Sequence, residues 1–306
     1  MAGPFLSLKI DFVFKKVFGS AANVEVLKDF LMSVLDLPAE EYQGLTLVDT
    51  HLKRDYIDDK MGILDLIIHT PSGQIINVEI QLALHPFMRE RLIFYTSGLI
   101  KEQIGAGDPY EAIKRVICIL ITDWVMVKDS HAYHNRYRLY DKKTGSELTD
   151  LVEVNVLELP KVPKESDRSP LWSWLRFISA EEEEEAAMLK DDNPHIEKAF
   201  GILKLLSGDE EVRFMAEARQ KAIMDYNARY DGGWRDGKAQ GREEGLAEGL
   251  AQGEVKGRME GRTEGLLSVA ENALRKDMPL PDIAELTGLS LVEIEALAAR
   301  LRRGDS

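Results

Sequence analysis

The pattern of apolar and polar positions divides the chain into a mixed first part and a helical second part. Within residues 5–36, apolar side chains recur at helical spacing, with Gly19 placed to end one helix and Asn23 to begin the next. The same spacing predicts a helix over residues 85–105. Apolar and β-branched runs predict strands at residues 44–52, 63–68, 75–82, 112–122, 131–141 and 148–159. This order, helix, three strands, helix and three strands, predicts an α/β fold in which helices flank a mixed sheet.

The pattern changes after residue 180. A run of glutamates begins a helical region, and residues 209–231 are typical of a charged amphipathic helix that ends near Gly232. Glycine then occupies every fourth position from Gly237 to Gly265, at a cost of about 1 kcal/mol for each glycine in a helix relative to alanine. Two interpretations remain open for this repeat. It is either a solvated helical linker or a segment that packs against another copy in a homo-oligomer.

The last residues predict a small helical hairpin. Gly288 is placed to end one helix, and Ser290 with Glu293 forms a capping box for the next. The outline resembles a helix-turn-helix, but Glu293 and Glu295 would repel phosphate, so we expect docking on protein. The predicted regions are a folded domain at 1–180, a helical region at 181–235, the glycine repeat at 236–268 and the hairpin at 269–306.

One predicted β-hairpin carries carboxylates within strands that are apolar on both faces, as in a sheet buried on both sides. The turn at residues 71–73, Pro-Ser-Gly, favours a three-residue loop whose register places Asp65 opposite Glu79. Gln81 then shares a face with Glu79. Because like charges opposite one another destabilise a sheet, a divalent cation between them is one interpretation. A slipped register, with one carboxylate in solvent, is the other.

Composition and charge narrow the class of protein. The chain is 44% hydrophobic and 30% charged, which is typical of a soluble globular protein. We see no secretion signal, the longest apolar run is too short to cross a bilayer, and the single Cys118 cannot form an internal disulfide. A cytoplasmic protein without a membrane partner is therefore expected. The net charge of −14 disfavours indiscriminate binding to nucleic acid, but most of the acidity follows residue 180.

Several motifs occur in a specific order. They are DFVFKKVFG, GILDLIIHTPSGQIINVEIQ, FMRERLIFYTSGLI, VLELPK and the glycine-rich tail. The set resembles the PD-(D/E)XK nuclease superfamily and, within it, the recombination-promoting nuclease or transposase-like family, over nearly the whole chain. The resemblance implies a restriction-endonuclease-like core with an all-helical C-terminal extension. It also implies a divalent metal ion, Mg²⁺ or Mn²⁺, and hydrolysis of DNA phosphodiester bonds.

The resemblance assigns roles to single residues. Asp65 matches the signature Asp and Glu79 the signature acid, so both are expected to be catalytic metal ligands. Gln81, the third expected catalytic residue, stands where the superfamily has Lys, and a glutamine can orient water but adds no charge. The resemblance also marks four supporting positions, namely Asp11, Lys60, Arg91 and Tyr95.

Three of the supporting residues also have purely structural interpretations. Asp11 can be a helix N-terminal acid, Arg91 an ion-pair partner that joins helix to sheet, and Tyr95 a core residue. The sequence gives no role to Lys60.

The sequence therefore predicts a metal-dependent DNA endonuclease linked to recombination or transposon-like mobility, with DNA as partner and a homo-oligomer formed through the helical C-terminal region. The alternative is a catalytically degenerate nuclease fold that serves as a DNA- or protein-binding oligomeric scaffold. The retained pair Asp65 and Glu79 favours the enzyme, whereas Gln81 and the acidic net charge favour the scaffold.

Overall fold

The computed structural model describes residues 5–48, 66–191 and 193–302. The chain divides into two compact units, Met1–Arg229 and Tyr230–Ser306. Each unit is described by itself.

The first unit is built on a six-stranded mixed sheet, as the sequence predicts. The strand order is β1-β2-β3-β4-β6-β5, and β3, β4 and β6 run parallel whereas the other neighbours are antiparallel. The parallel strands β3 and β4 lie at the centre and are almost completely buried. The strands are β1 Thr46–Val48, β2 Leu66–His69, β3 Ile75–Gln81, β4 Val116–Thr122, β5 His134–Tyr140 and β6 Glu147–Glu158.

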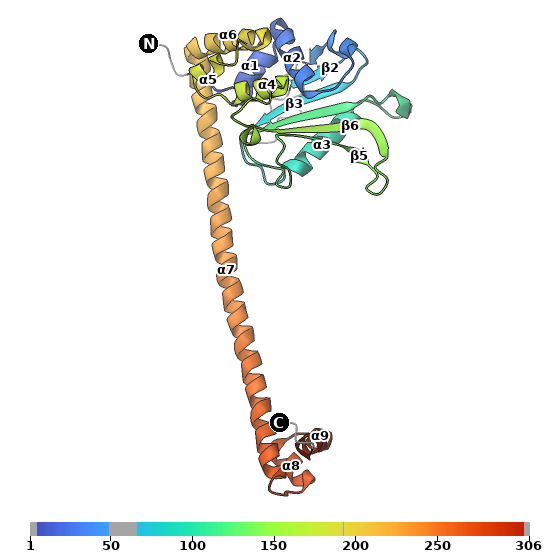
Figure 1. Cartoon of the computed structure of the whole chain (residues 1–306), viewed down its shortest axis with the longest axis vertical. Coiled ribbons are helices and arrows are strands. Elements are labelled where there is room, and N and C mark those ends of the chain that lie inside the picture. The colour runs from blue at the N-terminus through green and yellow to red at the C-terminus, as the bar shows by residue number, and fades with distance from the viewer. Residues whose placement is uncertain (1–4, 49–65, 192, 303–306) are drawn as a thin grey trace. The chain divides into compact units, whose positions relative to one another are not determined.

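Helices cover both faces of this sheet. One face carries α1 (Asp11–Phe18), α2 (Val24–Val34) and α4 (Pro170–Ser179), and the other carries α3 (Met88–Lys101) (Figure 1). Alternate residues of β3 therefore enter different cores. The larger core lies under α1, α2 and α4, where Phe14, Phe18, Phe30 and Trp174 pack ring against ring.

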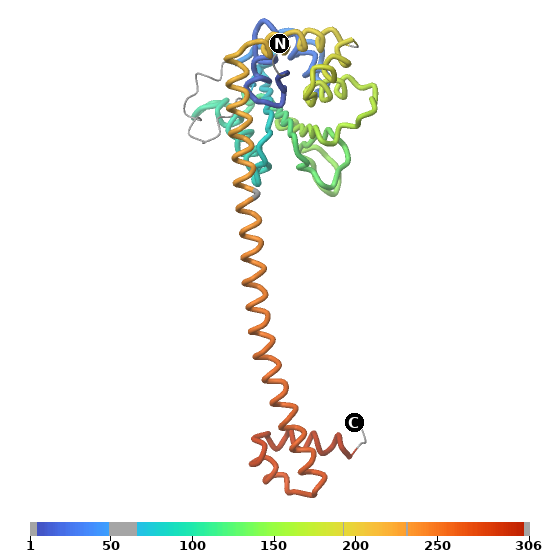
Figure 2. Tube along the Cα trace, turned by 90° about the vertical axis from the view of Figure 1, so that its left-hand side faces the viewer, coloured from blue at the N-terminus to red at the C-terminus, as the bar shows by residue number. Residues whose placement is uncertain are grey.

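The larger core continues past residue 180, the boundary that the sequence predicts for the first domain. It includes side chains of α5 (Glu183–Ala187), of α6 (Pro194–Gly208) and of the first turns of α7 (Glu210–Leu274). The first turns of α7 run beside α1 (Figure 2). The helices α1, α2 and α4 therefore bury part of their apolar surface against these later elements.

Helix α7 contains the glycine repeat. The expectation that a helix ends near Gly232 is wrong, because α7 continues without a break from Glu210 to Leu274. At each glycine from Gly237 to Gly265, no described atom other than the nearby helix backbone lies within 4 Å of the position that a Cβ would take. Pairs of opposite charge four residues apart, such as Glu254 with Arg258, support the helix.

The end of the second unit is the helical hairpin that the sequence predicts. Helix α8 (Leu280–Thr287) ends at Gly288, whose φ of 70° is left-handed, and α9 (Leu291–Arg302) follows. Ser290 N–H donates to Glu293 Oε2 at 2.9 Å, and Glu293 N–H donates to Ser290 Oγ at 3.3 Å, so the capping box is confirmed. Among the helices described, none is long and apolar enough to span a membrane.

Candidate active site

The β2–β3 hairpin adopts the predicted register over its described residues. Leu66 faces Val78, and the pairing continues to the turn, where Thr70 N–H donates to Gln74 O at 3.0 Å. Gly73 has a φ of 86°, the left-handed conformation that the three-residue loop requires. The strands therefore pair as the pattern of apolar residues and the Pro-Ser-Gly turn indicate.

Two residues that the sequence assigns to the site, Asp65 and Lys60, lie outside the described residues. The expected pairing of Asp65 with Glu79 stays a prediction.

Glu79 lies on the central strand β3 and is only 3% exposed. Strand periodicity directs Ile75, Asn77 and Glu79 to the α3 side of the sheet, where Ile75 joins the core of α3. Within the described part of the chain, no hydrogen-bond donor reaches Glu79 Oε1 or Asn77 Oδ1. Two oxygen atoms on one face, two residues apart, are thus buried without a partner, which is costly unless something binds them.

Arg91 of α3 is the charged neighbour of Glu79. Burial raises the pKa of Glu79 to about 7, and the charge of Arg91 acts in the opposite direction. Nε and Nη2 of Arg91 are buried, and neither has a hydrogen-bond partner among the described residues. The guanidinium carbon lies 5.4 Å from the centre of the Tyr95 ring, one helical turn further along. Arg91 and Tyr95 therefore share one face of α3, as their four-residue spacing indicates.

Gln81 ends the same strand. It is partly exposed, shares the face of Glu79 by the two-residue period, and pairs with Thr122 of β4. The backbone carbonyl oxygen of Gln81 accepts a hydrogen bond from Asp123 N–H at 3.4 Å. Gln81 thus stands at the carboxyl end of two adjacent parallel strands, where α/β enzymes commonly place their sites.

Asp11, the first residue of α1, is engaged elsewhere. It is 8% exposed, and both of its carboxylate oxygens accept hydrogen bonds from Arg219 of α7. Asp11 Oδ1 also accepts the N–H of Phe12 at 2.8 Å. These contacts satisfy the carboxylate of Asp11 within the protein.

Comparison with known families agrees with this geometry. A family model described as PD-(D/E)XK nuclease family transposase matches residues 8–233. The chain belongs to the PD-(D/E)XK nuclease family transposases. No curated protein and no solved structure matches the chain.

Family membership identifies the mixed sheet with its flanking helices as a restriction-endonuclease-like core. It also supports a nuclease or transposase-like function, with DNA as the partner that such a family suggests. PD-(D/E)XK nucleases generally use divalent metal ions.

The donor set of the PD-(D/E)XK core suits such an ion. Among the residues described, no group of three or more His, Cys, Asp and Glu side chains could hold a metal. However, Glu79 Oε1 and Asn77 Oδ1 are buried oxygens without a protein donor, and oxygen is the ligand that Mg²⁺ and Mn²⁺ prefer. The residues present therefore fit a divalent cation bound by oxygen.

Glu158 is another buried carboxylate, which the sequence pattern does not single out although it lies in the VLELPK motif. It is fully buried at the end of β6 and accepts hydrogen bonds from the N–H groups of Met126 and Val127 at 2.6 and 2.9 Å. Lys161 Nζ donates to it at 2.6 Å. These donors compensate its burial, so Glu158 fixes the loop after β4.

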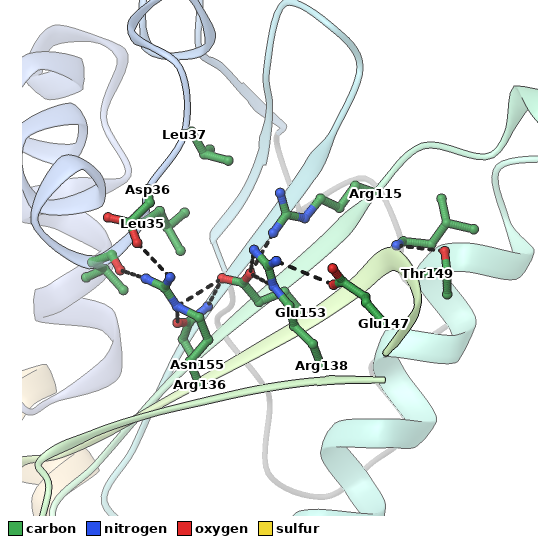
Figure 3. A network of polar contacts seen from close by, with 12 residues as sticks. Leu35, Asp36, Leu37, Arg115, Arg136, Arg138, Glu147, Thr149, Glu153 and Asn155 are labelled. Atoms are coloured by element: carbon green, nitrogen blue, oxygen red, sulfur yellow. Dashed lines mark hydrogen bonds and ion pairs between the residues drawn. The ribbon is translucent and has the colours of Figure 1, made fainter. Parts of the chain in front are cut away.

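Glu153 of β6 is the centre of an arginine network that no pattern in the sequence indicates (Figure 3). Arg115 and Arg138 donate to its Oε2 at 2.5 and 2.6 Å. Burial acts to raise the pKa of Glu153, but hydrogen bonds from Asn155 and Arg138 and the charges of Arg115 and Arg136 hold it below its usual range. The network joins β5 and β6 to Arg115, the residue directly before β4. In sequence, these residues are indistinguishable from exposed charges on an edge hairpin.

Proposed function

We propose that this chain is a divalent-metal-dependent DNA endonuclease in which Glu79 and Asp65 hold Mg²⁺ or Mn²⁺. The observation that carries the proposal is the buried carboxylate of Glu79. Its Oε1 has no partner among the described residues, and its charged neighbour is Arg91 of α3. A buried carboxylate oxygen without a donor is destabilising, and a cation would supply the missing partner. The described register supports Asp65 as the second ligand, because the pairing predicted for it continues the observed pairs.

Other residues of the chain would orient the water, contact the phosphate and position α1. A divalent ion bound here would lower the pKa of a bound water and stabilise negative charge on the phosphate. The side-chain amide of Gln81, at the strand end, can both accept and donate hydrogen bonds and would orient the attacking water. The side chain of Arg91 is only partly buried, so its guanidinium would pair with a phosphate oxygen, and Tyr95 holds the guanidinium from its ring face. Asp11 keeps α1 in place through Arg219.

The same proposal extends to the rest of the chain. The family match through residue 233 and the continuous core support a nuclease domain that extends beyond residue 180 to the start of α7. We assign 236–268 to self-association and 269–306 to a small helical hairpin. The enzyme acts in the cytoplasm on DNA, in recombination or transposon-like mobility.

The experiment is a cleavage assay on supercoiled plasmid. We expect nicked or linear product with Mg²⁺ or Mn²⁺ and none with EDTA. Asp65→Ala and Glu79→Ala should abolish cleavage, because each removes a metal ligand, whereas Glu40→Ala, an exposed acid, should have no effect. Gln81→Lys should retain or raise activity, because it adds the charge found in the superfamily.

Metal-dependent cleavage that survives both carboxylate substitutions would remove the catalytic assignment. DNA binding without cleavage under every metal condition would favour the degenerate scaffold, to which the uncharged Gln81 points.

A further inference from the structure

Helix α3 presents aromatic side chains to solvent beside the candidate site. Phe87, the residue directly before α3, is 64% exposed and Phe94 of α3 is 70% exposed, whereas Met88 and Leu92 of α3 are buried against the sheet. Two large aromatic side chains that are mostly exposed, next to the arginine that neighbours Glu79, indicate a binding surface.

Helical geometry places the two rings on the strip that contains Arg91. At about 100° per residue, Arg91 and Phe94 lie about 60° apart around α3, and Phe87 directly precedes its first turn. Gly98 continues the strip, and apart from its chain neighbours and the nearby helix backbone, no described atom lies within 4 Å of where its Cβ would be. Phe87, Arg91 and Phe94 thus form a continuous strip that we call the α3 strip, with open space at its end.

Ring contacts connect the α3 strip to the site. Phe94 meets Tyr95 edge to face at 5.7 Å between ring centres, and Tyr95 lies 5.4 Å from the guanidinium carbon of Arg91. Tyr95 therefore supports both neighbours, and it fixes the Phe94 ring in an orientation that leaves most of its surface in solvent.

The charges along α3 favour DNA as the occupant. The segment Met88–Lys101 contains the basic residues Arg89, Arg91 and Lys101 and one acid, Glu90, in a chain with a net charge of −14. A basic segment interleaved with exposed aromatic rings is the arrangement that binds single strands, since phosphates pair with the cations and bases stack on the rings.

We propose that Phe94, assisted by Phe87, is a stacking platform for an unpaired base of the DNA strand whose phosphate Arg91 contacts. This inference rests on the proposed function and names its substrate class. In an intact duplex both faces of a base are covered by its neighbours, so the rings are useful only where a nucleotide is unpaired. The substrate is DNA with an overhang, flap or gap next to the cut.

The test measures binding without cleavage. Fluorescence anisotropy in EDTA compares a blunt duplex with the same duplex carrying a single-stranded overhang, for wild type, Phe94→Ala, Phe94→Tyr and Phe214→Ala. Phe214 is the matched control, because it is 73% exposed on a different helix. We expect tighter binding of the overhang by wild type, about a tenfold loss of that affinity in Phe94→Ala, and wild-type affinity in the other two variants.

Three results would overturn the stacking platform. Wild type could show no preference for the overhang, or Phe94→Ala could lose the same affinity for both DNAs. Phe94→Ala could also dissociate an oligomer, which would make the α3 strip a contact between copies. Because no step requires catalysis, an inactive protein that shows the expected Phe94 effect refutes only the endonuclease. An active enzyme indifferent to Phe94 refutes only the platform.

Discussion

Arg219 Nε donates to both carboxylate oxygens of Asp11, at 3.2 and 3.0 Å, across 208 residues of sequence. A second anchor of the same helix lies two turns further on, where Asn227 Oδ1 accepts the N–H of Leu84 at 3.1 Å. Leu84 belongs to the connection between the strand of Glu79 and the helix of Arg91. The first turns of α7 therefore hold both α1 and the loop that links the two central residues of the candidate site.

Replacing Arg219 with alanine should destabilise the first unit. The substitution leaves the carboxylate of Asp11 buried without its cation, so we expect a loss of about 2–4 kcal/mol in the free energy of unfolding. Urea denaturation followed by circular dichroism measures it, with Arg242→Ala on the exposed part of α7 as the control. A loss no larger than that of the control would mean that the pair contributes nothing to stability.

Glu79 should make the stability of the metal-free protein depend on pH. The unfolded chain releases this proton near pH 4.5 and the folded chain near pH 7, so the free energy of unfolding falls as the pH rises between these values. Glu79→Gln removes this effect. In EDTA at pH 8 we expect the variant to be more stable than wild type by up to ~3 kcal/mol, with no difference from this cause at pH 4.

Thermal unfolding at several pH values checks this expectation. Added Mg²⁺ should then raise the Tm of wild type at pH 8, because binding stabilises the folded state, and leave that of Glu79→Gln unchanged. Identical pH profiles for the two proteins would show that Glu79 is not a buried acid with a raised pKa.

The glycine repeat should assemble copies of the chain. An isolated helix with eight glycines at about 1 kcal/mol each is unstable, and nothing else in the described structure packs on them. We expect the full chain to be oligomeric and a chain ending at Tyr230 to remain folded but monomeric, because the boundary between the two units lies there. Light scattering distinguishes the two, and a monomeric full chain at high concentration would make the repeat a linker.

The sequence predicts best what depends on local rules. The hairpin register follows from the turn at Gly73, and the end of α8 from Gly288, because each position demands a left-handed backbone. The prediction that the helix α7 ends near Gly232 is wrong, because the low helix propensity of glycine is only a weak prior and α7 continues to Leu274. The Asp11–Arg219 pair and the arginines around Glu153 join residues far apart in sequence. A local sequence pattern cannot predict such contacts. Glu79 was found because a carboxylate within an apolar strand is itself a signal.

Single-turnover cleavage of plasmid DNA as a function of Mg²⁺ concentration, for wild type and the isosteric Glu79→Gln, tests the central claim most directly, with Glu41→Gln as a buried-glutamate control away from the α3 side. We predict a wild-type rate that saturates with Mg²⁺ and is absent in EDTA. Glu79→Gln should lose roughly a hundredfold or more at every Mg²⁺ concentration, because a neutral amide is a poor metal ligand. Cleavage by wild type in EDTA, or a Glu79→Gln rate equal to that of wild type, would contradict the account.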